Sequence, residues 1–251
     1  SVDLTDGDAA WAMVDVVVEQ HGRLDVAIKN AGGSPATDTT AASPRFTSKI
    51  VTLNLLTAIY VAQRANHHMQ AGDGGSIINI GSVVAHRPAP GTAAYGAAKA
   101  GLYNFTRTVG QEWAPKVRTN FVTVGMVRTE TASYTYGDDA AIARVESTIP
   151  IGRLVLPDDV ADTCLFLASD AAAYITGADI NMDGGGDRPT WMDAVSGCPA
   201  GPAQSSSPAD CGFRRDQSAL EPTIGGSASA DCGFQREQIT LEPTNGEVGR
   251  S

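Results

Sequence analysis

The chain has 251 residues, of which 42% are hydrophobic, and it carries a formal net charge of −10 with a pI near 4.7. This acidity argues against nucleic-acid binding, and no apolar run approaches the roughly 18 residues that a membrane span needs. With four cysteines, too few for a disulfide scaffold, and no recognisable signal peptide, the sequence predicts a cytoplasmic protein of one or two domains.

The first part of the chain predicts a helix followed by a strand. Apolar side chains recur at helical spacing over residues 6–21, and a glycine follows them. Residues 24–28 predict a short buried strand that runs into Asn30-Ala31-Gly32. Asn and Gly favour any turn after a strand, so both an ordinary turn and a ligand-binding turn are compatible with this segment.

Residues 43–69 predict a long helix with Asn54 inside an apolar stretch. An Asn in a helix interior is unfavourable unless its amide finds hydrogen-bond partners. Asn54 therefore either bends the helix or serves a functional site.

The central part of the chain predicts a strand over residues 76–80 and a helix over residues 93–114. Ser82 follows the strand at its carboxyl end, where the sites of parallel sheets collect. Tyr95 and Lys99 are four residues apart in an Ala-rich helix, so they share one face. A Tyr and a Lys at this spacing are by themselves a common coincidence. Whether the pair is catalytic therefore depends on the other motifs in the chain.

Ser82, Tyr95 and Lys99 together suit proton transfer. An unperturbed Tyr has a pKa of about 10, and a nearby cation such as Lys99 lowers it. A Ser hydroxyl both donates and accepts, so it can hold a carbonyl or alcohol oxygen beside the phenol. The trio predicts chemistry at an oxygen whose carbon gains or loses a hydride, and the hydride itself requires a cofactor.

The second half of the chain predicts two further strands, over residues 118–124 and 176–182. Between them, residues 157–168 predict a helix that begins at a proline, which is favourable in a first helical turn. Cys164 lies on the apolar face of this helix and is expected to be a buried core thiol.

Taken together, these motifs resemble the short-chain dehydrogenase/reductase family over about residues 1–188. The resemblance is carried, in the family's order and spacing, by Asn30-Ala31-Gly32, Asn54, Ser82, Tyr95-Gly96-Ala97-Ala98-Lys99, Gly125 and Asp183-Gly184-Gly185. Each motif is weak alone, and the set is specific. The resemblance implies an α/β fold, a Rossmann-type doubly wound parallel sheet with helices on both faces.

The resemblance also implies NAD- or NADP-dependent interconversion of a secondary alcohol and a ketone. Ser82 is expected to hold the substrate oxygen, Tyr95 to be the general acid/base and Lys99 to lower its pKa and bind the nicotinamide ribose. Asn54 is expected to support a proton relay. The implied cofactor-binding residues are Asp3, Leu4, Asn30, Ala31, Gly32, Tyr95, Lys99, Val127 and Thr129. No metal is implied, and the expected partners are a small-molecule substrate and further copies of the chain, as a homodimer or homotetramer.

In this family, residues 131–149 correspond to a variable lid over the substrate. Its Tyr134 and Tyr136 either line an apolar pocket or pack the lid down, and they favour a lipid-like substrate over a sugar or a smaller ketone. His86, in the loop after Ser82, either touches the substrate or is solvated.

Three features depart from the family pattern. No Gly-rich turn precedes Asn30, Lys29 stands where the family usually has a second Asn, and Val124 stands where it usually has Pro. The chain starts like the end of the family's third strand, which predicts an N-terminally truncated fold lacking roughly two βα units of ~30 residues each. The choice between NAD and NADP is made in that segment. A non-catalytic remnant that cannot bind dinucleotide tightly is the alternative function.

From residue 194 the composition shifts to Pro, Ser, Gly and Ala, and residues 209–213 recur as residues 230–234. We predict a dehydrogenase domain over residues 1–193 and a disordered tail over residues 194–251. The tail cysteines lack the paired C-x-x-C spacing of a metal site. A protein that binds a partner through the tail repeat is a third interpretation.

Overall fold

A computed structural model describes residues 2–130, 132–186 and 191 of the chain. The predicted tail over residues 194–251, with its repeat and cysteines, lies outside the described residues. The domain boundary near residue 193 therefore stays a prediction.

Four parallel strands form one sheet in the order β1-β2-β3-β4. The strands are β1 (Val26–Lys29), β2 (Gly75–Ile80), β3 (Val117–Val124) and β4 (Asp179–Met182). β2 is buried along nearly its whole length because both its faces are covered, and its two buried polar residues, Ser76 and Asn79, have hydrogen-bond partners. The predicted Rossmann-type parallel sheet is confirmed.

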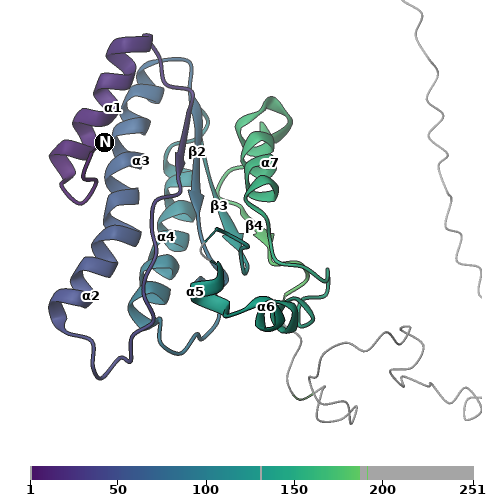
Figure 1. Ribbon diagram of the computed structural model, residues 1–251. Coiled ribbons are helices and arrows are strands. Elements are labelled where there is room, and N and C mark those ends of the chain that lie inside the picture. Colours follow the sequence, from purple (N-terminus) through teal and green to yellow (C-terminus); the bar gives the residue numbers. More distant parts are fainter. Residues whose placement is uncertain (1, 131, 187–190, 192–251) are drawn as a thin grey trace, which may run out of the picture. The chain divides into compact units, whose positions relative to one another are not determined.

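Helices cover both faces of this sheet (Figure 1). The main ones are α1 (Gly7–His21), α3 (Thr57–Ala71), α4 (Ala93–Glu112) and α7 (Pro157–Ala168). Successive residues of a strand point to opposite faces of the sheet, so the core has one part on each face. Ile77 packs towards α3, whereas Ile78 and Val122 pack against Cys164 and Leu167 of α7. Cys164 is 6% exposed, as expected of a core thiol.

The first helix forms where its sequence predicts it. Asp6 caps α1, because its carboxylate accepts hydrogen bonds from the backbone N–H groups of Asp8 (3.0 Å) and Ala9 (3.3 Å). Gly22 ends the helix with a φ of 75°, a left-handed conformation that glycine adopts without a steric penalty. None of the helices in the described part of the chain is long and apolar enough to cross a membrane.

The long helix predicted over residues 43–69 is interrupted. It consists of α2 (Pro44–Val51), a π-helical turn (Thr52–Leu56) and α3. Asn54, in the middle of the π turn, donates a side-chain hydrogen bond of 2.9 Å to the carbonyl of Ile50. Side chains that bond the preceding turn disturb the regular helix, and π turns concentrate at functional sites. The helix is therefore widened where Asn54 enters the site.

The lid and the last strand also differ from the prediction in detail. The lid region contains two short helices, α5 (Ala132–Tyr136) and α6 (Asp139–Glu146). The last strand starts at Asp179 and not at residue 176, because Gly177 turns the chain there with a φ of 67°.

Candidate active site

Ser82 is placed by the strand end that precedes it. Gly81 still pairs with the sheet, and its N–H donates to the carbonyl of Val122 at 2.7 Å. A Cβ on Gly81 would lie 2.0 Å from the ring of Phe121, so only glycine fits over this buried ring. Ser82 follows at once and begins a short 3₁₀ turn, with its hydroxyl accepting from the N–H of Val84 at 3.4 Å.

The structure brings Ser82, Tyr95 and Lys99 together. The Ser82 side chain lies close enough to the Tyr95 phenol on α4 to affect the pKa of that phenol. One helical turn later, the Lys99 Nζ lies 5.7 Å from the centre of the Tyr95 ring and donates a 2.7 Å hydrogen bond to the carbonyl of Ile80. The carboxyl end of β2 thus holds both Ser82 and the ammonium group.

Electrostatics at this trio differ from the expectation in one respect. Burial raises the pKa of the Tyr95 phenol above its ordinary value, and the hydrogen bond from Ser82 opposes that shift. The predicted lowering of the Tyr95 pKa by Lys99 is not found, because the ammonium is held by the Ile80 carbonyl and burial dominates. The pKa of Lys99 is itself lowered to about 8, first by burial and then by the charge of Lys29.

Asn54 fixes the turn that follows β1. Its side chain is 1% exposed; the amide oxygen accepts from the N–H of Gly33 at 2.8 Å, and the amide nitrogen donates to the carbonyl of the same residue at 2.9 Å. A Cβ on Gly32 would lie 2.6 Å from the Asn54 Oδ1, so this close approach requires glycine. The exposed Asn30 makes no side-chain hydrogen bond within the described residues, so Asn54 and not Asn30 pins this turn.

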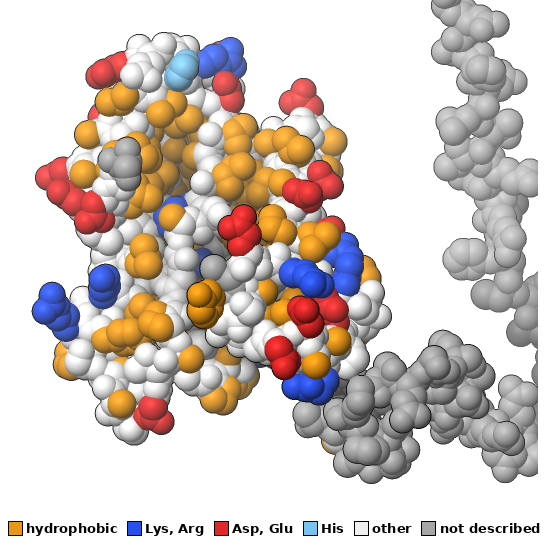
Figure 2. All heavy atoms as spheres, in the orientation of Figure 1, with side chains coloured by type: hydrophobic (Ala, Val, Ile, Leu, Met, Phe, Trp, Pro, Cys, Tyr) orange, Lys and Arg blue, Asp and Glu red, His pale blue; other side chains and the backbone are white. Residues whose placement is uncertain are grey.

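A cleft of about 800 Å³ lies between α7 and the carboxyl ends of β1, β2 and β3, and its lining does not include Ser82, Tyr95 or Lys99. Figure 2 shows hydrophobic side chains gathered in the hollow on this face. Three predicted cofactor-binding residues, Asn30, Val127 and Thr129, line it, and so does Ile80, whose carbonyl holds Lys99.

The other predicted cofactor-binding residues lie elsewhere. Ala31 and Gly32 are exposed in the turn after β1. Asp3 and Leu4 are not among the residues that line the cleft. The carboxylate of Asp3 accepts from the backbone and hydroxyl of Thr5, and Leu4 packs against the core beside α1.

The cleft fits a ring of a dinucleotide better than it fits the pyrophosphate. Its volume is that of a small-molecule site, and it lies at the carboxyl ends of parallel strands, where open α/β sheets bind ligands. The residues present suit an apolar ring with a few polar contacts. A pyrophosphate needs free N–H groups at a helix start, but the first turn of α1 is acidic at Asp8 and capped by Asp6, and no Gly-rich turn opens a helix among the described residues.

A second, polar cavity of about 360 Å³ was not predicted from the sequence. It begins at Val83, the residue after Ser82, and its lining includes His86, Thr123, Asp179 and Asp183. The His86 Nε2 lies 3.0 Å from both the Thr123 Oγ1 and the Asp179 Oδ2, and the Thr123 hydroxyl donates to the Asp179 Oδ1 at 2.7 Å. The sequence signal that could have predicted this cavity is the polar residues at alternate positions of β3 and β4.

The lid tyrosines do not line a pocket together. Tyr136 packs with Ile142, Ile149 and Leu154 in a small core of the lid, whereas Tyr134 is 90% exposed. For Tyr136, packing the lid down is the interpretation that the structure supports.

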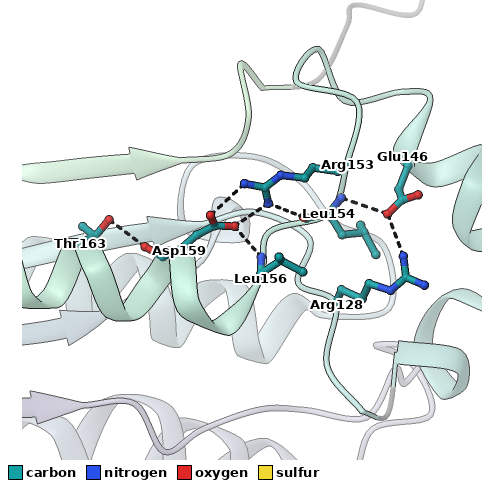
Figure 3. A network of polar contacts seen from close by, with 7 residues as sticks. All are labelled: Arg128, Glu146, Arg153, Leu154, Leu156, Asp159 and Thr163. Carbon is teal, nitrogen blue, oxygen red and sulfur yellow. Dashed lines mark hydrogen bonds and ion pairs between the residues drawn. The ribbon is translucent and has the colours of Figure 1, made fainter.

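A polar network joins the lid to the start of α7 (Figure 3). Arg153 forms two hydrogen bonds to the carboxylate of Asp159, of 2.5 and 2.8 Å, and Asp159 also accepts from the N–H of Leu156. Glu146 of α6 contacts Arg128 at 3.5 Å. The loop between α6 and α7 is thereby tied to the helix that forms one wall of the cleft.

Comparisons with known proteins agree with this architecture. A family described as Enoyl-(Acyl carrier protein) reductase matches residues 1–187. Among similar proteins, "Tropinone reductase-like 3" of Erythroxylum coca is 35% identical over 175 residues, covering 69% of this chain and 67% of the relative. The "3alpha-hydroxysteroid dehydrogenase" of Mediterraneibacter gnavus is 34% identical over 182 residues, covering 72% of each. A crystal structure of a putative short-chain alcohol dehydrogenase from Sinorhizobium meliloti superposes with a TM-score of 0.70 at 34% identity, covering 74% of each chain.

Proposed function

Because the chain belongs to the short-chain dehydrogenase/reductase family of oxidoreductases, we propose that it interconverts a secondary alcohol and a ketone with NAD or NADP. The observation that carries this proposal is that Ser82 and the buried Lys99 both lie beside the Tyr95 phenol at the end of β2. A phenol, a hydroxyl and an ammonium at one strand end form a site that handles a proton at a substrate oxygen.

Each residue has a distinct part in this proposal. The Ser82 hydroxyl holds the substrate oxygen, and the Tyr95 hydroxyl gives it a proton or takes one from it. Lys99, held by its hydrogen bond to the Ile80 carbonyl, supplies positive charge. Asn54 holds the turn at Gly33 in place by hydrogen bonds. Asn30, Val127 and Thr129 would hold the nicotinamide end of the cofactor in the cleft, and the cofactor supplies or accepts the hydride when it is bound.

The protonation of Tyr95 favours one direction at neutral pH. Since burial raises its pKa, the phenol carries its proton and is ready to donate it to a ketone oxygen. Alcohol oxidation needs the phenolate and is therefore expected to speed up towards alkaline pH.

The substrate class follows from the surroundings of Ser82. The polar cavity that starts at Val83 presents His86, Asp179 and Asp183, and Tyr136 is taken up by the packing of the lid. These neighbours support a hydroxylated substrate over the lipid-like substrate that the lid sequence favours. Matched sets of polyhydroxy ketones and steroid or acyl ketones, assayed for NAD(P)H consumption, discriminate the two.

The experiment that tests the activity is a dinucleotide titration of the full chain. NADH and NADPH are added while fluorescence and melting temperature are followed; ligand at 100 times its Kd should add about 2.7 kcal/mol of stability. Saturable binding with turnover that is lost in Tyr95→Phe supports the proposal. Absence of binding by both dinucleotides favours the non-catalytic alternative, which is consistent with the acidic first turn of α1.

A further inference from the structure

Two buried lysines meet on one face of the sheet. Lys29, the last residue of β1, is paired in register with Asn79 of β2. Side chains of paired residues in a parallel sheet point to the same face. The Asn79 amide donates to the Thr106 hydroxyl on α4 at 3.0 Å, so this is the α4 face, which also carries Lys99.

The hydrogen bonds of the two ammonium groups place them close to each other. The Lys29 Nζ donates to the carbonyl of Ala31, and a Cβ on the next residue, Gly32, would lie 3.7 Å from the Lys99 Nζ. The Lys99 Nζ in turn donates to the carbonyl of Ile80, the residue after Asn79. Lys29 and Lys99 are 7% and 4% exposed, so water screens little of the field between them.

Neither lysine has an acidic partner among the described residues. The groups that face them are Asn54 from the π turn, Asn79 from β2 and Tyr95 with Thr106 from α4. All of these are uncharged at neutral pH. Among the residues that the structure describes, Lys29 is the cation whose charge acts on Lys99, and both ammonium groups donate to backbone carbonyls.

We propose that Lys29 is a positioning residue that sets the pH range of the site by placing a second ammonium group beside Lys99. This inference rests on the proposed function for its catalytic consequence, but the coupling between the two lysines is a property of the chain itself. Like charges disfavour each other's charged form. Burial lowers the pKa of both groups to about 8, and at Lys99 the charge of Lys29 adds to that shift, in agreement with the geometry.

The consequence for the reaction follows from the sign of this coupling. A charged Lys29 makes Lys99 release its proton at lower pH than it otherwise does. Replacing Lys29 by a neutral side chain therefore keeps Lys99 charged to higher pH. If turnover requires the charge of Lys99, the upper pH limit of turnover rises together with the pKa of Lys99.

The test is a direct titration of the lysine side chains. The full chain is labelled with ¹³C,¹⁵N-lysine, and the Cε and Nζ shifts of Lys99 are followed with pH in the native protein, Lys29→Met and Lys29→Asn. We expect the Lys99 midpoint to rise by about one pH unit in both variants. By reciprocity, Lys99→Met must raise the midpoint of Lys29 by the same amount. The exposed Lys49→Gln, which removes the same charge elsewhere, leaves both midpoints unchanged.

The outcomes separate this inference from the proposed function. An unchanged Lys99 midpoint in a folded Lys29→Met or Lys29→Asn variant overturns the coupling; if both variants unfold, the reciprocal Lys99→Met titration decides. A shifted midpoint with no turnover at any pH sinks the proposed function but leaves the coupling standing. A shifted midpoint together with an upward-shifted pH profile of kcat/KM, restored by Lys29→Arg, supports both.

Discussion

The ammonium nitrogen of Lys99 lies 5.7 Å from the centre of the Tyr95 ring, but its hydrogen bond goes to the carbonyl of Ile80. The strand end that carries Ser82 therefore also holds the lysine. Ile80, the last residue of β2, holds the ammonium through its carbonyl, and Ser82 follows two residues later. A shift at the end of β2 therefore displaces the Ser82 hydroxyl and the ammonium together.

The first prediction concerns the phenol. Tyr95→Phe removes the hydroxyl that we assign as acid/base, and ketone reduction should fall by about 10²–10⁴-fold, the usual contribution of such a group. The half-buried ring keeps its packing, so the melting temperature should change little. Steady-state kinetics and thermal melts measure the two effects. Tyr103→Phe, on the same helix, is the control, because it removes a hydroxyl from a ring that packs on His86 and Phe121. Near-native turnover in Tyr95→Phe would contradict the assignment.

Much of this site could be predicted because local spacing fixes it. Tyr95 and Lys99 share a face wherever a helix forms, and Ser82 follows an apolar run that has to end as a strand. The parallel sheet follows from strands that alternate with helices. That Asn54 restrains the turn after β1 could not be predicted, because only the fold shows that Asn54 is buried against Gly33.

Other features depended on packing over long distances in sequence. Asn54 in the π turn contacts Gly33, 21 residues earlier, and no local pattern encodes that contact. The polar cavity joins His86 to Asp179 across the sheet, which only the register of β3 and β4 determines. The pKa of Tyr95 is raised mainly by burial, and burial cannot be read from residue spacing.

A second prediction concerns the glycine before Ser82. Gly81→Ala places a methyl group 2.0 Å from the Phe121 ring, so the strand end or the ring must move. Overpacking of this kind costs typically about 1–3 kcal/mol, and turnover should fall with the displacement of Ser82. Urea unfolding and kinetics measure the two effects. Gly7→Ala is the matched control, because its added methyl stays at an ordinary 3.5 Å from Tyr60.

A second-site change sharpens this prediction. Phe121→Leu in the Gly81→Ala background vacates part of the ring volume and should recover some of the lost turnover. If Gly81→Ala alone is as stable and active as the native chain, the close approach to Phe121 matters neither for stability nor for turnover, and the prediction is wrong.

A third prediction concerns Asn54. Asn54→Ala removes two hydrogen bonds to Gly33 and one to Ile50 and leaves the buried groups of that turn without partners. Unsatisfied buried groups cost about 1–3 kcal/mol each, so we expect a loss of roughly 2–4 kcal/mol in the free energy of unfolding. Hydrogen exchange should also show faster opening of the turn after β1. Asn66→Ala, on the same long helix but only half-buried, should cost far less. Equal costs for the two variants would show that the Gly33 contact contributes nothing.

The last prediction is a pH dependence of stability centred on Asp15. Its carboxylate accepts hydrogen bonds from Arg64 at 2.5 and 2.8 Å and lies 2.6 Å from the His68 Nε2, and these partners lower its pKa to about 2. A carboxyl whose pKa is depressed on folding stabilises the protein above its unfolded pKa of about 3.9, and the stabilisation is lost as pH falls towards 2. Asp15→Asn should therefore lower the melting temperature at pH 6, and the difference from the native chain should disappear between pH 4 and pH 2. Glu19→Gln, one turn later on α1, is the control, and a pH-independent effect of Asp15→Asn would show that the carboxylate's charge does not matter.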